Sequence, residues 1–122
     1  MRVVFIGTGE IGVPALRALE SSTEHQLVGI VTQPDKPVGR TQQIQSPPIK
    51  SGLIAEGIPI LQPPRLKDSG AIDEIRQLAP DAIVVMAYGQ ILPPAVLAPL
   101  KYRLPLLVMV LLPAVLLSLK IT

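Results

Sequence analysis

The stretch AIVVMAYGQILPP, residues 82–94, decides the fold. It begins with six uncharged residues, Ala82 to Ala87, which are rich in β-branched side chains and follow the turn signal Pro80-Asp81. Such a run is typical of a central strand in a parallel sheet that is covered on both faces. Because ligands of open α/β sheets gather at the carboxyl ends of strands, the loop that starts at Tyr88 is either a ligand edge or an ordinary connection to a helix.

Upstream of this stretch, strand and helix patterns alternate from the first residue. Short apolar strands are predicted at residues 3–6, 27–31 and 58–61, and a helical pattern follows each of them. The resulting order, β-α-β-α-β-α-β, predicts an α/β fold with a Rossmann-like doubly wound parallel sheet over residues 1–100. Beyond the strand at 82–87, a fifth core strand is expected near residues 106–112.

The helices are predicted from their caps and from apolar residues that recur every three to four positions. The first helix should start near Glu10 or Ile11. The second should be capped by Ser46, with Pro47 first, and end at Gly57. The third should be capped by Asp68 or Ser69. The buried faces are expected to carry Ile11, Ala15, Leu16 and Leu19 in the first helix and Ile72, Ile75, Leu78 and Ala79 in the third.

Composition excludes several classes of site. The chain has 122 residues, no Cys and a single His25, so disulfides, thiolate metal sites and a zinc site are excluded and no metal is expected. Aromatic residues make up 2% of the chain, which argues against stacking platforms for single-stranded nucleic acid. The apolar run at residues 3–6 is too short for a secretory signal, and a cytoplasmic location is expected.

The charge divides the chain into two pieces. Residues 1–100 hold eight Lys and Arg against nine Asp and Glu, whereas residues 101–122 hold three basic residues and no acid. We therefore expect a Rossmann-like subdomain over 1–100 and an atypical apolar tail over 101–122. The tail contains 16 uncharged residues, 104–119, interrupted by two prolines. A membrane span needs about 20 apolar residues, so a short anchor is the less favoured reading of this run.

Two glycine-containing segments suggest ligand binding. Gly7, Gly9 and Gly12 have the G-x-G-x-x-G spacing of dinucleotide-binding turns, but no acid follows the second strand, where Val31-Thr32-Gln33 stands. A tight strand-to-helix turn explains the same spacing. The other segment is a long polar loop, residues 32–46, and loops of this length are generally functional or disordered.

This loop and several other segments together resemble methionyl-tRNA formyltransferases. The similar segments cover residues 1 to about 102 in the family's order: 1–8 with 13–16, 32–40 with 46–50, 57–63, and 79–93. The resemblance implies a truncated form of that fold and an enzyme that transfers a formyl group from 10-formyltetrahydrofolate to initiator methionyl-tRNA. By the same resemblance, Arg40 would contact the tRNA, with Lys36 a weaker candidate. The folate ring would lie against Gln90, Ile91 and Leu92, and Tyr88 would pack beneath that loop.

The tail departs from the family where the chemistry is expected. The family places an Asn and a His in an Asn-Leu-His-x-Ser-Leu-Leu-Pro segment, and the matching positions here are Leu106 and Val108. Aliphatic side chains neither hydrogen-bond nor carry a proton, so no catalytic residue is assigned and the chain is expected to be inactive alone. We favour the hypothesis that a frameshift or a divergent gene end produced the tail.

Three classes of function are therefore open. The first is a truncated methionyl-tRNA formyltransferase, and the second is an NAD(P)-binding Rossmann oxidoreductase fragment. The third is a non-catalytic remnant that binds folate or tRNA, with membrane attachment as one form of this alternative. The oligomeric state is not determined by the sequence.

Overall fold

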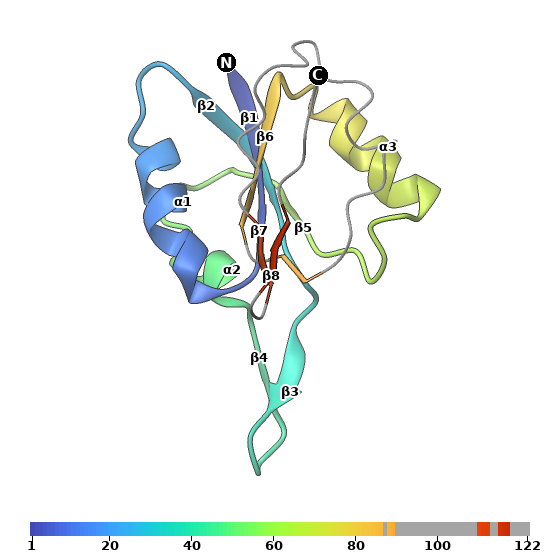
Figure 1. Ribbon diagram of the computed structural model, residues 1–122. Coiled ribbons are helices and arrows are strands. Elements are labelled where there is room, and N and C mark those ends of the chain that lie inside the picture. The colour runs from blue at the N-terminus through green and yellow to red at the C-terminus, as the bar shows by residue number, and fades with distance from the viewer. Residues whose placement is uncertain (87, 90–109, 113–114, 118–122) are drawn as a thin grey trace.

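Four parallel strands form the sheet at the centre of the computed structural model, which describes residues 1–86, 88–89, 110–112 and 115–117. The strands are β1 (Arg2–Gly7), β2 (Gln26–Val31), β5 (Ile60–Leu61) and β6 (Ala82–Met86). They are arranged in the order β5-β2-β1-β6, so β1 pairs with β2 on one side and with β6 on the other (Figure 1). This is the predicted Rossmann-like parallel sheet, and the fold class is confirmed.

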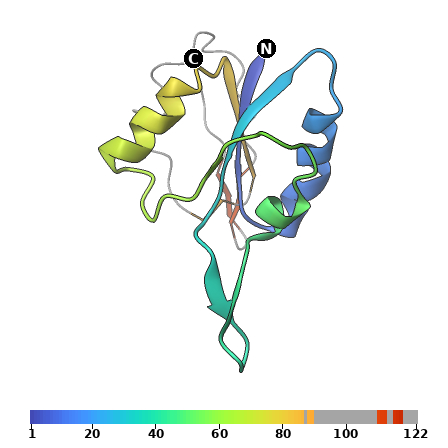
Figure 2. The ribbon, with the colours of Figure 1, turned by 180° about the vertical axis from the view of Figure 1, so that it is seen from behind.

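Helices cover both faces of the sheet. The 3-10 turn η1 (Glu10–Gly12), α1 (Val13–Glu20) and α2 (Pro48–Gly52) lie on one face, and α3 (Ser69–Gln77) lies on the other, as two opposite views show (Figures 1 and 2). Successive residues of a strand point to opposite faces, so β1 contributes Phe5 to the α1 side and Val4 and Ile6 to the α3 side. The sheet is therefore doubly wound, with a separate apolar core on each face.

The first helix begins later than its apolar pattern predicts. Glu10 to Gly12 form the 3-10 turn, and the α-helix starts at Val13 with Pro14 in its first turn. Leu16 is fully buried as expected, but Ile11 is 52% exposed because it lies in the 3-10 turn rather than on the helix face. The prediction that Ile11 belongs to the buried face is wrong.

The second helix is shorter than predicted. It starts at Pro48, with Pro47 rather than Ser46 at the cap, and ends at Gly52 instead of Gly57. The backbone N–H groups of residues 54 and 55 donate to the carboxylate of Glu20, at 2.9 Å for Ala55, so they are satisfied without further helical turns. Gly57 has a φ of +80° in the turn before the next strand, which is also shorter than the predicted 58–61.

The third helix begins after Asp68, as predicted, although no side-chain hydrogen bond caps it. Ile72 and Ile75 are buried and Leu78 is half-buried against the core. Ala79 was expected on the same face but is exposed, because the helix ends at Gln77 and Ala79 takes a left-handed φ of +50°.

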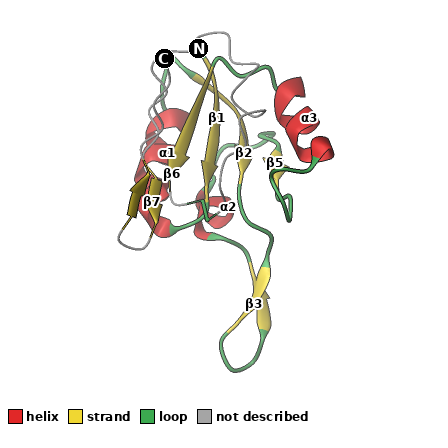
Figure 3. Ribbon diagram, turned by 45° about the vertical axis from the view of Figure 1, so that its right-hand side comes forward, coloured by secondary structure: helices red, strands yellow, loops and turns green. Residues whose placement is uncertain are grey.

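The predicted loop at residues 32–46 contains an antiparallel hairpin. Strands β3 (Lys36–Val38) and β4 (Gln43–Gln45) pair along three residues each and project from the carboxyl edge of the sheet (Figures 1 and 3). The tip turns through Gly39 at φ +75° and Gln42 at φ +52°. The predicted long loop is therefore ordered rather than disordered, because local pairing and a tight turn suffice to order two short strands whose residues are all exposed.

The last described strands differ from the sequence-based expectation. β6 was predicted to be central and covered on both faces, but it is the outermost strand of the described sheet, and Val84 and Met86 are only half-buried. Residues 110–112 form β7, which pairs antiparallel with β8 (Val115–Leu117) in a separate two-stranded sheet. They are therefore not the expected fifth core strand, and residues 106–109 lie outside the described part of the chain. The described residues contain no helix long and apolar enough to cross a membrane.

Candidate functional site

The sheet has its switch point between β1 and β6. From β1 the chain adds β2 and then β5 on one side, whereas β6 joins on the other, and ligands of such sheets bind where this direction reverses. At the carboxyl ends of these strands, the Thr8 hydroxyl donates to the carbonyl oxygen of Tyr88 at 2.8 Å and accepts from the backbone N–H of Gln33 at 3.3 Å. One threonine thus connects the segments that follow β1, β2 and β6.

Glycines allow the backbone at this edge to pack closely. A Cβ at Gly7 would lie 2.6 Å from the carbonyl oxygen of Met86, and a Cβ at Gly12 would lie 3.0 Å from the Phe5 ring. Gly9 has a φ of −78°, which any residue adopts. Packing therefore explains two of the three glycines of the G-x-G-x-x-G spacing without a dinucleotide.

A polar cluster links this edge to the base of the β3–β4 hairpin. The Gln62 amide nitrogen donates to the Gln33 carbonyl at 3.1 Å and to an Asp35 carboxylate oxygen at 2.7 Å. Lys50 Nζ lies 3.2 Å from Asp35 Oδ2 and 2.9 Å from Gln62 Oε1. The Gln62 hydrogen bond, followed by that of Lys50, lowers the pKa of Asp35 below its usual 3.8.

The predicted RNA-contacting residues are both on the hairpin. Arg40 lies in the exposed turn at its tip, and Lys36 is the first residue of β3, at its base. Neither side chain makes a hydrogen bond or ion pair with the described residues. Lys36 lines a cavity of about 230 Å³ between the hairpin and the sheet edge, together with Thr8 and Gln33. The structure therefore separates Arg40 from this cavity and places Lys36 beside it.

The predicted folate residues Gln90, Ile91 and Leu92 lie outside the described residues. The described chain reaches Gly89, whose φ of +100° suits glycine and whose Cβ position lies 2.9 Å from the Gln33 side chain. Tyr88 is 1% exposed in the core on the α3 side, and burial raises its pKa to about 12. Its burial agrees with the prediction that it packs rather than reacts.

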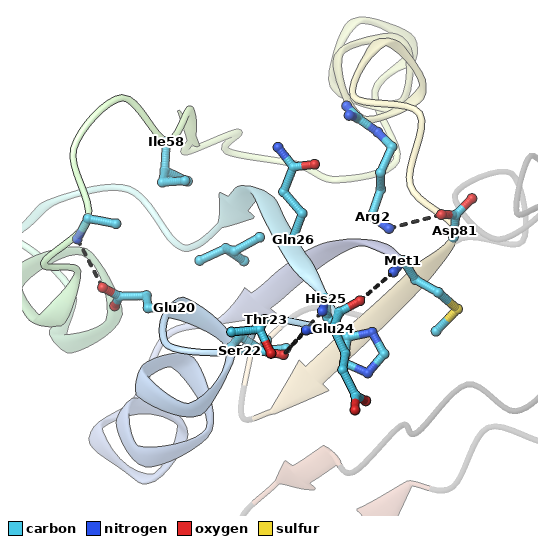
Figure 4. A pocket seen from close by; sticks show the side chains of 13 residues that line it. Met1, Arg2, Glu20, Ser22, Thr23, Glu24, His25, Gln26, Ile58 and Asp81 are labelled. Carbon is cyan, nitrogen blue, oxygen red and sulfur yellow. Dashed lines mark hydrogen bonds between the residues drawn. The ribbon is translucent and has the colours of Figure 1, made fainter.

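A larger hollow lies at the opposite, amino end of the strands. It measures about 560 Å³ and is bordered by Arg2, Glu20, His25 and Asp81, among others (Figure 4). Several of its polar groups bond to one another: the backbone N–H of Arg2 donates to the Asp81 carboxylate at 2.9 Å, and the Met1 amine donates to the Glu24 carbonyl at 3.0 Å. The carboxyl edge, with its gathered loops, remains the candidate site.

Sequence reasoning did not single out Thr8, Gln33 or Gln62 as site residues. Each follows a strand at the carboxyl edge, since Thr8 comes after β1, Gln62 after β5 and Gln33 two residues after β2. A polar residue within two positions of the end of each predicted strand is the signal that could have found them. Thr8 and Gln62 hold the loops of this edge together through their own hydrogen bonds. The described residues contain no group of His, Cys, Asp or Glu that could hold a metal ion.

Comparison with known proteins identifies the family of this fold. A family model described as "Formyl transferase" matches residues 1–114. The chain belongs to the formyl transferase family. The formyl transferases are one-carbon transferases, and this assignment, with the packing of Gly7 and Gly12, leaves the oxidoreductase alternative without support.

Curated relatives agree with the family. The chain is 48% identical over 97 residues to the methionyl-tRNA formyltransferase of Alkaliphilus oremlandii, 53% over 92 residues to that of Akkermansia muciniphila, and 51% over 102 residues to that of Citrifermentans bemidjiense. These matches cover 80%, 75% and 84% of this chain and 31%, 29% and 32% of the respective relatives. This formyl transferase chain thus spans about a third of the length of the curated relatives it matches.

Proposed function

We propose that this chain forms the amino-terminal part of a methionyl-tRNA formyltransferase, an enzyme that transfers a formyl group from 10-formyltetrahydrofolate to the amino group of initiator methionyl-tRNA. The observation that carries the proposal is the β3–β4 hairpin of this formyl transferase chain. The hairpin projects beside the switch point and bears two cations that have no partner among the described residues. Relatives of the same name, about half identical in sequence, support the substrate assignment.

In this proposal the hairpin binds the tRNA. Arg40 presents a planar, permanently charged guanidinium to phosphate oxygens from the exposed tip, and Lys36 adds a second charge at the base. No acidic residue lies between Lys36 and Lys50, so nothing within this segment competes for Arg40. The hairpin therefore offers a local positive surface on a subdomain whose net charge over residues 1–100 is −1.

The formyl donor is assigned to the carboxyl edge of the sheet. The Gln90-Ile91-Leu92 segment directly follows Gly89, and we propose that it provides the backbone groups and apolar wall for the pterin ring. The close packing of Gly7 and Gly89 at this edge supports a preformed wall there. A location in the cytoplasm follows from a substrate that belongs to translation initiation.

The chain is proposed to bind these substrates without catalysing the transfer by itself. Leu106 and Val108 occupy the positions at which similar enzymes carry an Asn and a His, and neither side chain stabilises an oxyanion or accepts a proton. Residues 1–100 would then be a binding subdomain, and residues 101–122 a segment of different character. Folate or tRNA binding without turnover is the expected behaviour.

The first test is the affinity of the purified chain for initiator methionyl-tRNA, measured by filter binding at low salt. Arg40→Ala should weaken binding by about tenfold through the loss of a charge-assisted phosphate contact, whereas the matched variant Arg17→Ala, on the exposed side of α1, should not. Equal effects of both substitutions would contradict the hairpin assignment.

The second test incubates the same protein with 10-formyltetrahydrofolate and methionyl-tRNA. We expect 10-formyltetrahydrofolate to raise the melting temperature of the protein. We also expect that no formylmethionyl-tRNA is formed. Formyl transfer by this chain would disprove its proposed inactivity and leave the family assignment intact.

A further inference from the structure

The cluster of Asp35, Lys50 and Gln62 brackets the hairpin in the chain. Asp35 directly precedes β3, Lys50 lies in α2 five residues after β4 ends, and Gln62 directly follows β5 of the central sheet. Lys50 Nζ contacts both Asp35 carboxylate oxygens, at 3.2 and 3.3 Å, and both side chains bond to Gln62. The entrance and exit of the hairpin are thus joined to each other and to a fixed point of the sheet.

Beyond this base, few contacts with the rest of the protein fix the direction in which the hairpin points. Every residue from Asp35 to Ser46 is exposed, including Ile44 at 66%. All three ribbon views, from the front, from behind and turned by 45°, show the hairpin extending away from the sheet and helices (Figures 1, 2 and 3). Pairing of β3 with β4 fixes the shape of the hairpin, but its angle to the sheet depends on contacts at the base.

The exit from the hairpin is itself fixed. Ile49, beside Lys50, is fully buried against the α1 side of the sheet, and its backbone N–H donates to the Thr8 carbonyl at 3.3 Å. Gln62 is held in turn through its bond to the Gln33 carbonyl. Lys50, in α2, and Gln62, directly after β5, therefore both hold Asp35 in place through their bonds to its carboxylate.

We propose that Asp35, Gln62 and Lys50 are positioning residues that fix the angle of the β3–β4 hairpin and so direct Arg40 toward the tRNA backbone. The part that concerns tRNA rests on the proposed function; the part that concerns the hairpin angle does not. The lowered pKa of Asp35 agrees with a carboxylate kept ionised by these partners.

This proposal and simple electrostatics predict opposite results. Asp35 neutralises Lys50, so removing its carboxylate adds one net positive charge beside the RNA-binding hairpin. Charge alone would then strengthen tRNA binding. A hairpin whose angle is no longer fixed would instead bind tRNA more weakly. Gln62→Ala should weaken tRNA binding in the same way without any change of charge.

The hairpin angle is measured first, without RNA. The chain has no native cysteine, so spin labels attached through Thr41→Cys at the tip and Glu74→Cys on α3 report a single distance. We expect a narrow distance distribution in this parent and a broad or shifted one after Asp35→Ala or Gln62→Ala. Glu56→Ala, at an exposed acid outside the cluster, should leave the distance distribution unchanged. Its melting curve is the reference against which the folding of the two cluster variants is compared. An unchanged distribution in both cluster variants would overturn the proposal.

The second measurement is the affinity for initiator methionyl-tRNA in a double-mutant cycle. Asp35→Ala and Gln62→Ala should each weaken binding about five- to tenfold, and this effect should largely vanish in an Arg40→Ala background because the lost interaction is then already absent. Additive effects would show that the cluster acts independently of Arg40 and would overturn the positioning role. A parent protein that does not bind tRNA would refute the proposed function, while the distance measurement would still decide the hairpin angle.

Discussion

At the scale of single residues, Gly7 explains why β1 and β6 can approach so closely. A methyl group at this position would overlap the Met86 carbonyl and the Phe5 ring, which lie 2.6 and 2.7 Å from the Cβ position. Neither neighbour is free to move, since one is strand backbone and the other is a fully buried side chain. The residue is therefore required by the sheet itself.

Gly7→Ala should lower the free energy of unfolding by about 1–3 kcal/mol, the usual cost of overpacking. Urea unfolding at neutral pH measures this change. The matched control is Gly70→Ala, because nothing lies within 4 Å of its Cβ position and it belongs to α3. That substitution should raise stability slightly through helix propensity. A Gly7→Ala protein as stable as the parent would contradict the close packing at the switch point.

The burial of Tyr88 predicts that the free energy of unfolding decreases at alkaline pH. Its pKa is raised to about 12 by burial, above the usual 10.0, so the folded protein keeps the phenol proton between these values while the unfolded chain loses it. The unfolded state then binds fewer protons, and stability that is complete below pH 10 falls as pH rises toward 12. Urea midpoints at pH 9, 10 and 11 should decline in the parent and decline less in Tyr88→Phe. Identical pH profiles would refute this assignment.

At the scale of elements, the β3–β4 hairpin combines order with exposure. At low pH, the contacts at the base of the hairpin depend on the ionisation of Asp35. The pKa of this carboxyl lies below 3.8 because of its hydrogen bonds with Gln62 and Lys50. A lowered pKa means that the contribution of the cluster is complete above the unfolded value and disappears as pH falls through the folded one. NMR titration of the Asp35 side-chain carbonyl carbon should give a midpoint below 3.8, and Gln62→Ala should move it upward. A midpoint that is insensitive to Gln62 would contradict the cluster geometry.

The hairpin should be dispensable for folding. Because residues 37–44 are all exposed, replacing them by a short Gly-Ser turn removes little buried apolar surface. We expect the melting temperature to change by no more than a few degrees and tRNA binding to fall to background. Calorimetry and filter binding on the same sample measure both quantities. A large loss of stability would show that the hairpin belongs to the core.

The elements that the sequence predicts well are those that bury an apolar face. β1, β2 and β6 read as uncharged runs, and Ile72 and Ile75 mark the buried side of α3. The hairpin escaped prediction because Lys36–Val38 and Gln43–Gln45 are exposed and pair only with each other. The end of α2 was missed because it depends on Glu20, a residue 34 positions earlier whose carboxylate replaces the helical acceptor for the backbone N–H of Ile54.

At the scale of the whole molecule, charge restricts how tRNA could be bound. Residues 1–100 carry a net charge of −1, so attraction of tRNA to this subdomain comes from the local cations of the hairpin rather than from the subdomain's overall field. With two phosphate contacts, the logarithm of the tRNA affinity should fall with the logarithm of salt concentration with a slope of about −1.5. Binding measured across a KCl series tests this number. A slope steeper than about −4 would indicate a much larger basic surface elsewhere in the chain.

The candidate site was predictable only in part. The switch point follows from the order of strands, and the resemblance to methionyl-tRNA formyltransferases directs attention to Arg40 and Lys36. The contacts of Thr8 with Tyr88 and of Gln62 with Asp35 join residues that are 80 and 27 positions apart. No local pattern encodes such distances, so these contacts appear only when the sheet brings the strand ends together.

The order in which the sheet is completed has a consequence during synthesis. β1 leaves the ribosome first, yet one of its two neighbours is β6, which begins at residue 82 and is fastened by paired bonds between Arg2 and Asp81. At ~5–20 residues per second, that neighbour follows roughly 4–16 seconds later. Throughout this interval one edge of the most buried strand has no partner, which makes the nascent chain a substrate for chaperones that shield apolar segments.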